Sequence, residues 1–99
     1  MIKHIVFFRF KENLNKDQRI DKAEQLRLIF HPLKSHPSVD DYRIGINISE
    51  SEDAWDMVID STFDSFASLE EYRVSSEHRS AIEKGKKFPK DKSVIDYEF

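Results

Sequence analysis

The sequence predicts an α+β domain in which strands and helices follow the order βαββαβ. Two patterns support this prediction: four short segments are rich in β-branched and aromatic residues, and two longer segments repeat apolar residues at helical spacing. The chain has 99 residues, of which 38% are hydrophobic, and this is enough apolar material for one small core. We therefore expect a single domain that spans residues 1–99.

The first half of the chain predicts a strand, a helix and a second strand. Residues 2–10 interrupt their apolar run with single polar residues, which favours an extended segment. Asn15 and Gln18 have the spacing of a capping box at the start of a helix, and Pro32 should end or bend its last turn. Residues 39–49 alternate apolar and polar side chains, which is typical of a strand with one wetter face.

The third strand and the second helix are expected from the segments that follow. Residues 55–63 predict the third strand, and the short polar connection before it predicts an antiparallel hairpin with the second strand. Ser68 and Glu71 have the spacing of a capping box for the second helix. As an alternative, Asp64 or Ser65 begins this helix one turn earlier.

The last strand completes the predicted topology. Pro89 and the charged residues after it should close the second helix, and residues 93–99 should form the final strand. A chain of this length in the order βαββαβ predicts a ferredoxin-like protomer, with a four-stranded antiparallel sheet and both helices on one face.

The first strand carries apolar side chains on both of its faces. Phe8 lies on one face, and Ile5 and Phe7 lie on the other. Because two helices cover only one face of the sheet, and large exposed apolar patches are rare on monomers, we expect a homodimer through the helix-free sheet face. The alternative is a monomer in which the long side chains of Lys3 and Arg9 cover the patch.

Composition argues against several classes of partner. A net charge of −3, from 19 acidic and 16 basic residues scattered along the chain, does not favour nucleic acid. No segment approaches the roughly 18 uncharged residues that span a bilayer, so we expect no membrane insertion. The chain has no cysteine, which fits a reducing compartment, and we expect a cytoplasmic protein. His31 and His36 lack the spacing of a helical zinc pair, and no metal site is expected.

Tyr72 and His78 are the first candidates for chemistry. In one unbroken helix of about 100° per residue, these side chains would diverge by roughly 120° and would not meet. Ser75 and Ser76 compete for backbone hydrogen bonds and favour a break between them, and Ser76 followed by Glu77 could cap a fresh helical start. A bend at this point would return His78 toward Tyr72.

His4 and Asp96 complete the candidate cluster. His4 shares the face of Phe8 on the first strand, and Asp96 lies on the final strand, which pairs with the first in this topology. A carboxylate that faces a histidine can fix its tautomer, as in acid–base sites. We expect Ile59, Phe88 and the first helix to supply the apolar walls of a pocket. The alternative is that the four polar residues are ordinary core-edge and surface positions.

Three segments together resemble a known family. "MIKHIVFFRFK" at the start, "STFDSFASLEEYRVSSEH" in the middle and "VIDYEF" near the end are similar to the stress-responsive dimeric α/β-barrel (Dabb) proteins. The resemblance covers essentially the whole chain. It implies a ferredoxin-like protomer and a homodimer whose two sheets form a dimeric α/β barrel.

The resemblance also implies roles for the candidate residues. The family includes a plant polyketide cyclase, olivetolic acid cyclase, and by similarity His78 would be the general base and Tyr72 the hydrogen-bond donor to an oxyanion. His4 and Asp96 would be pocket residues, and no cofactor would be needed. The chain departs from the family at Ser75–Ser76, where other members commonly carry His-Pro, and the loss of that proline removes a rigid bend before His78.

Three functions remain open at this stage. The first is a stress-responsive protein whose small apolar pocket binds or transforms a small aromatic or polyketide-like compound by cyclase-like acid/base chemistry. The second is a noncatalytic module that binds a small apolar ligand. The third is a cofactor-free monooxygenase.

Overall fold

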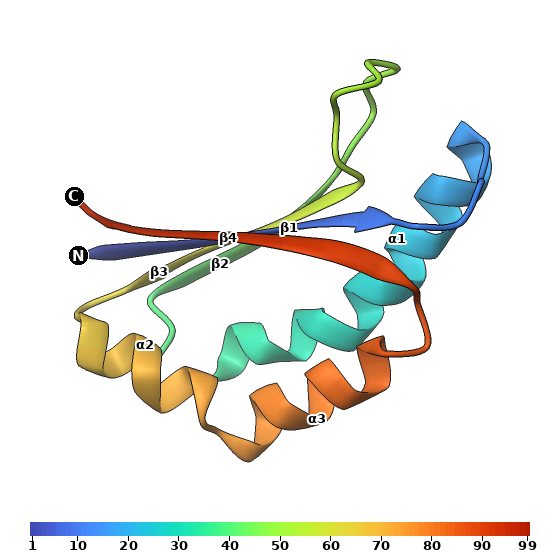
Figure 1. The fold of residues 1–99 in the computed structure, drawn as a ribbon. Coiled ribbons are helices and arrows are strands. Elements are labelled where there is room, and N and C mark those ends of the chain that lie inside the picture. The colour runs from blue at the N-terminus through green and yellow to red at the C-terminus, as the bar shows by residue number, and fades with distance from the viewer.

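The computed structural model describes all 99 residues and has the predicted order of strands and helices, with the second helix divided in two. The elements are β1 (Ile2–Phe10), α1 (Lys16–Phe30), the 3-10 helix η1 (His31–Ser35), β2 (Asp41–Ile46), β3 (Met57–Phe63), α2 (Phe66–Arg73), α3 (Ser76–Gly85) and β4 (Lys90–Glu98). All helices lie on one face of the sheet, and the opposite face carries none (Figure 1). The ferredoxin-like fold predicted from the sequence is therefore confirmed.

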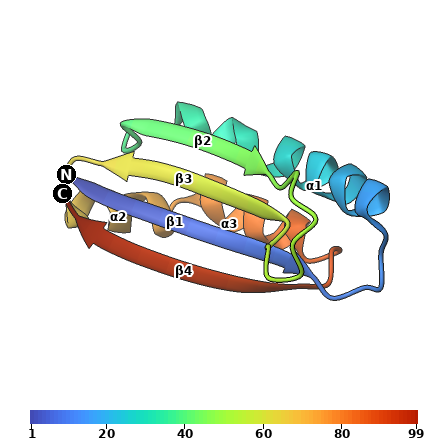
Figure 2. The same ribbon diagram turned by 90° about the horizontal axis from the view of Figure 1, so that it is seen from above.

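The four strands form one antiparallel sheet in the order β2-β3-β1-β4. β1 is paired on both sides, whereas β2 and β4 are the edge strands (Figure 2). The register places His4 opposite Asp96 on β4 and opposite Ser61 on β3. The two termini lie side by side, because Phe99 N–H donates to the Met1 carbonyl at 3.1 Å.

The start and end of α1 follow the sequence signals. The Asn15 side chain accepts from the Gln18 amide at 2.9 Å, and the Gln18 side chain accepts from the Asn15 amide at 2.9 Å, which completes the capping box. The α-helix ends at Phe30, two residues before Pro32, and the chain continues as η1. Proline disrupts a helix interior because it lacks an N–H donor, and this explains the change of geometry.

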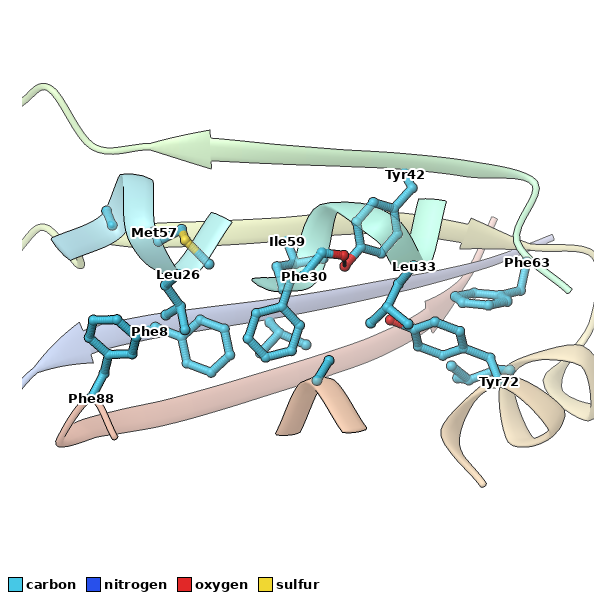
Figure 3. Close-up of a cluster of buried hydrophobic side chains, with 14 of the residues drawn as sticks. Phe8, Leu26, Phe30, Leu33, Tyr42, Met57, Ile59, Phe63, Tyr72 and Phe88 are labelled. Atoms are coloured by element: carbon cyan, nitrogen blue, oxygen red, sulfur yellow. Dashed lines mark hydrogen bonds between the residues drawn. The ribbon is translucent and has the colours of Figure 1, made fainter. Parts of the chain in front are cut away.

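The core lies between the sheet and the helices. Figure 3 shows Phe8, Leu26 and Phe88 gathered at one end of this layer, and Phe63 and Tyr72 at the other. The sixteen buried hydrophobic residues form one cluster. The alternation predicted for β1 is confirmed, since every second residue from Ile2 to Phe10 is buried under the helices.

Four element boundaries differ from the prediction, and one of them is the start of β3 at Met57 instead of residue 55. The helix α2 is capped by Ser65, whose side chain accepts from the Ser68 amide at 3.2 Å, so the Ser68–Glu71 capping box was the wrong choice. The strand β2 is shorter than residues 39–49. The strand β4 begins at Lys90 instead of residue 93, because an edge strand exposed to solvent accepts charged side chains that a central strand excludes.

The helix-free face of the sheet is apolar and open. Phe7, Ile95, Tyr97 and Phe99 are 37%, 53%, 45% and 63% exposed, respectively. Phe7 packs against Trp55, and Arg9 lies over the Trp55 ring at 4.5 Å. No helix has both the length and the apolar character needed to cross a bilayer.

Candidate functional site

A break between α2 and α3 brings Tyr72 and His78 together. The Ser75 side chain accepts from the His78 amide at 3.2 Å as the N-cap of α3, and its hydroxyl donates to the Tyr72 carbonyl at 2.6 Å. One serine therefore ends the first helix and starts the second. The predicted break is confirmed, with Ser75 rather than Ser76 as the cap.

The two aromatic rings of Tyr72 and His78 are in contact as a result. Their centroids are 4.8 Å apart, and the rings meet edge to face at 63°. His4 lies 6.5 Å from the same tyrosine ring and Phe63 lies 5.1 Å from it, centroid to centroid. Figure 3 shows the Tyr72 ring beside Phe63, with its hydroxyl directed away from α2 toward Leu33.

His4 and Asp96 face each other across the β1–β4 pair. They are directly opposite in register, and the His4 Nδ1 is hydrogen-bonded to an Asp96 carboxylate oxygen. His4 is 5% exposed, whereas the Asp96 side chain is 25% exposed. Because an ionised carboxylate only accepts hydrogen bonds, the proton lies on Nδ1 and the Nε2 of a neutral His4 is left as an acceptor.

A small cavity lies where these side chains meet. Its volume is about 90 Å³, and three polar rings line it: His4, Tyr72 and His78. Its apolar walls come from the sheet and two helices: Val6, Phe8, Ile59 and Val94 on the strands, Phe30 on α1 and Ile82 on α3. No three His, Asp or Glu side chains gather as ligands of a metal would.

The structure places Ile59 in the cavity wall but not Phe88. The prediction for Phe88 is wrong in position, because α3 ends at Gly85 and Phe88 follows it in the connection to β4. There Phe88 is buried against Phe10, with ring centroids 6.4 Å apart. Phe8, rather than Phe88, lies in the cavity wall.

The protonation of the two central groups is set mainly by burial. Burial lowers the pKa of His78 below its ordinary 6.5, and the electrostatic effects of the neighbouring His4, Lys92 and Arg73 side chains act in the same direction. Burial raises the pKa of Tyr72 to about 12, against a smaller opposite effect of a hydrogen bond with the Tyr42 hydroxyl. Near neutral pH the site therefore holds a neutral imidazole beside a protonated phenol.

Three residues of the site escaped the sequence reasoning. His36 packs edge-on against Tyr72 with centroids 5.6 Å apart, although its turn-like surroundings gave no sign of this contact. Arg73 and Lys92 line the cavity. Lys92 shares the side of β4 that carries Asp96, and this parity would have identified it if the strand had been extended to Lys90.

Comparisons with known proteins agree with this fold. A family model described as the stress responsive A/B barrel domain matches residues 2–99. No curated protein matches the chain.

Several solved structures have a similar fold. A dimeric protein of unknown function and ferredoxin-like fold from Bacteroides fragilis is 21% identical, with a TM-score of 0.83 over 99% of this chain and 95% of that one. A dimeric ferredoxin-like protein of unknown function from Thermobifida fusca is 19% identical, with a TM-score of 0.81 over 99% and 90%. Hydroxynitrile lyase from Passiflora edulis is 20% identical, with a TM-score of 0.68 over 97% and 90%.

At these identities the structural likeness shows a shared fold, and the two bacterial relatives are described as dimers. The match of the family model over nearly the whole chain is more specific. The chain belongs to the stress responsive A/B barrel domain (Dabb) family.

Proposed function

We propose that this protein is a cofactor-free enzyme that performs acid/base chemistry on a small aromatic or polyketide-like compound, with His78 as the general base and Tyr72 as the oxyanion donor. The observation that carries the proposal is the contact of these two rings at 4.8 Å, beside a cavity. The roles are those implied by the resemblance to olivetolic acid cyclase.

The protonation states suit these roles. In the proposed step, the neutral His78 takes a proton from a carbon beside a carbonyl group, the C–H electron pair forms the enolate double bond, and negative charge develops on the oxygen. Tyr72, with its pKa raised to about 12, keeps its proton and donates a hydrogen bond to that oxygen. The enolate carbon then attacks a second carbonyl of the same substrate, and protonated His78 returns the proton to the new alkoxide.

The His4–Asp96 pair holds a second imidazole at the same cavity. Since its Nδ1 is bound to Asp96, the His4 ring is fixed in orientation and presents its other nitrogen. We assign Asp96 to the positioning of His4, and His4 to the polar part of the cavity wall beside His78. Ile59 contributes to the apolar wall that holds the substrate.

The size of the cavity limits the substrate. Its volume of about 90 Å³ is well below the roughly 300 Å³ at which sites for drug-sized ligands begin. A single small ring or a short chain fits this space, and a longer substrate would extend through the opening beside β4.

Deuterium exchange into ethyl acetoacetate tests the proposed chemistry, because exchange requires only the first proton transfer. We expect the protein to accelerate exchange above the buffer rate, and His78→Ala to lower that acceleration by about 10²–10⁴-fold. Tyr72→Phe should also lower it, and His31→Ala, which removes an exposed histidine, should not.

Three outcomes would contradict the proposal. Ligand binding without exchange would favour a noncatalytic binding module. Oxygen consumption with a phenolic substrate, without exchange, would favour a cofactor-free monooxygenase. Wild-type exchange that His78→Ala leaves unchanged would remove His78 from the chemistry.

We further infer that two protomers pack through their helix-free sheet faces as a dimeric barrel. The exposed apolar side chains of Phe7, Ile95 and Tyr97 support this arrangement, since patches of this kind are uncommon on monomers. A hollow of about 410 Å³ beside Phe7, Gly45 and Trp55 leaves room on the same face for side chains of a second copy.

Analytical ultracentrifugation tests the interface. We expect a particle of twice the 11.8 kDa chain mass, and Phe7→Lys should dissociate it. Leu28→Lys, on the exposed side of α1, is the matched control and should remain dimeric. A folded wild-type particle of 11.8 kDa would refute the dimer.

A further inference from the structure

Positive charge gathers at the opening of the cavity. Arg73 and Lys92 line it, and Lys90 lies two residues from Lys92 on the same side of β4. No carboxylate belongs to the lining, and the nearby Asp96 is bound to His4. The chain as a whole has a net charge of −3, so this cationic opening is a local feature.

Lys92 is the cation of this group with no protein partner. The Arg73 guanidinium donates to Glu70 at 3.2 Å, and the Lys90 ammonium donates to the Gly85 carbonyl at 2.6 Å. Lys92, in contrast, forms no ion pair and no side-chain hydrogen bond. An exposed ammonium above an apolar cavity has the arrangement of an anchor for an anionic ligand.

The register of β4 explains how Lys92 reaches the opening. Lys92 is paired with Phe8 and Val94 with Val6, and both β1 residues are cavity walls. Lysine can lay its aliphatic stem along apolar surface and keep its charged group in water. This position therefore joins the apolar wall to the solvent.

We propose that the ligand of the Tyr72–His78 site is a small carboxylate whose apolar body enters the cavity and whose anionic group pairs with Lys92. This inference rests on the proposed function and names the substrate class of that site. Arg73 attracts the carboxylate more weakly, because its guanidinium already donates a hydrogen bond to the Glu70 carboxylate.

The pairing has a consequence for His78. Lys92 and Arg73 contribute to lowering the pKa of His78, after burial and His4. A bound carboxylate offsets these positive charges, so it raises the basicity of the imidazole at the moment when a substrate is present.

A matched pair of ligands tests the proposal by NMR titration. Benzoate and benzamide have nearly the same shape, and only benzoate is charged. At low salt we expect the wild-type protein to bind benzoate about fivefold more tightly than benzamide, as for one exposed ion pair. Lys92→Met should abolish this preference, whereas Lys92→Arg and the exposed-site control Lys34→Met should keep it.

Three results of the titration would overturn the inference. It is wrong if benzoate does not bind, if the two ligands bind equally, or if Lys92→Met keeps the preference. Salt should weaken benzoate binding and leave benzamide binding unchanged. Exchange of the neutral ethyl acetoacetate by the wild-type protein separates this inference from the proposed function. Exchange without a preference for benzoate would refute only the carboxylate anchor, and a preference for benzoate without exchange would refute only the proposed chemistry.

Discussion

The two ends of the layer between sheet and helices differ in polarity, although the same strands supply both. At one end, Phe10, Leu26 and Phe88 are buried members of the hydrophobic cluster. At the other end, β1 contributes His4, which meets Tyr72 beneath α2. The difference arises in the helical layer. The long α1 lies over the first end, and α2 lies over the second end, next to the break that separates it from α3.

The comparison assigns stability mainly to the apolar end of the core and the proposed chemistry to the end that holds Tyr72 and His78. A continuous helix presents one apolar stripe to the core. A helix interrupted at Ser75 redirects the side chains that follow and leaves a cavity of about 90 Å³. We therefore expect substitutions at the first end to change mainly the free energy of unfolding, and substitutions at the second end to change the proposed chemistry.

The largest expected effect on stability is at Leu26, which is completely buried. Leu26→Ala should lower the free energy of unfolding by about 2–5 kcal/mol, because it removes buried methyl groups and leaves a cavity. Leu28→Ala, on the same helix at 69% exposure, is the matched control and should change it by less than about 0.5 kcal/mol. Urea denaturation measures both. A similar loss in the two variants would show that α1 does not cover the apolar end as described.

A smaller effect is expected at Asp56, the buried carboxylate nearest the apolar end. It accepts from the Phe10 amide at 2.8 Å and from Arg19 at 2.9 Å. Asp56→Ala should cost about 1–3 kcal/mol in urea denaturation, because a buried N–H loses its acceptor. Asp56→Asn keeps an acceptor and should cost less. Equal losses in both variants would assign the effect to charge rather than to the hydrogen bond.

The helix break itself is tested by two serine caps that accept the same kind of hydrogen bond. Ser65 and Ser75 each accept from an amide three residues on at 3.2 Å. Replacement of either by alanine should cost about 1 kcal/mol of stability. Only Ser75→Ala should also lower deuterium exchange, since Ser75 positions His78. If Ser65→Ala lowers exchange equally, the break has no special part in the site.

The smallest effect is the pH dependence that His78 brings. Its pKa lies below 6.5 in the folded protein, so the unfolded chain takes up the proton more readily. The contribution of His78 to stability is complete above pH 6.5 and is lost as pH falls through the folded-state pKa. NMR titration of the imidazole should show a midpoint below that of the same residue in urea. A midpoint above the urea value would contradict the buried, cation-facing environment.

The sequence was sufficient for the fold because its local signals agree with one another. The capping box at Asn15, the change of helix type before Pro32 and the alternation along β1 all follow from short-range preferences. The helical angle between Tyr72 and His78 was also enough to require a break. That argument used no knowledge of how the helices pack.

The rest of the site depended on packing that no local pattern encodes. His36 reaches Tyr72 only because η1 and α2 lie over the same end of the sheet. Lys92 was missed because charged residues after Pro89 have low strand propensity, and an edge strand tolerates them. Phe88 was misplaced for a related reason. The second helix was expected to continue to Pro89, whereas α3 ends at Gly85 and Phe88 lies in the connection to β4.

The position of β4 in the sheet has a consequence for biosynthesis. Of the four strands β4 is synthesised last, yet it pairs with β1, which is synthesised before the other three. Until β4 docks, β1 exposes an unsatisfied backbone edge, and His4 lacks the carboxylate that orients it. A nascent chain therefore pairs the outer edge of β1 and places Asp96 against His4 in the same event, and a chain truncated before β4 would have neither.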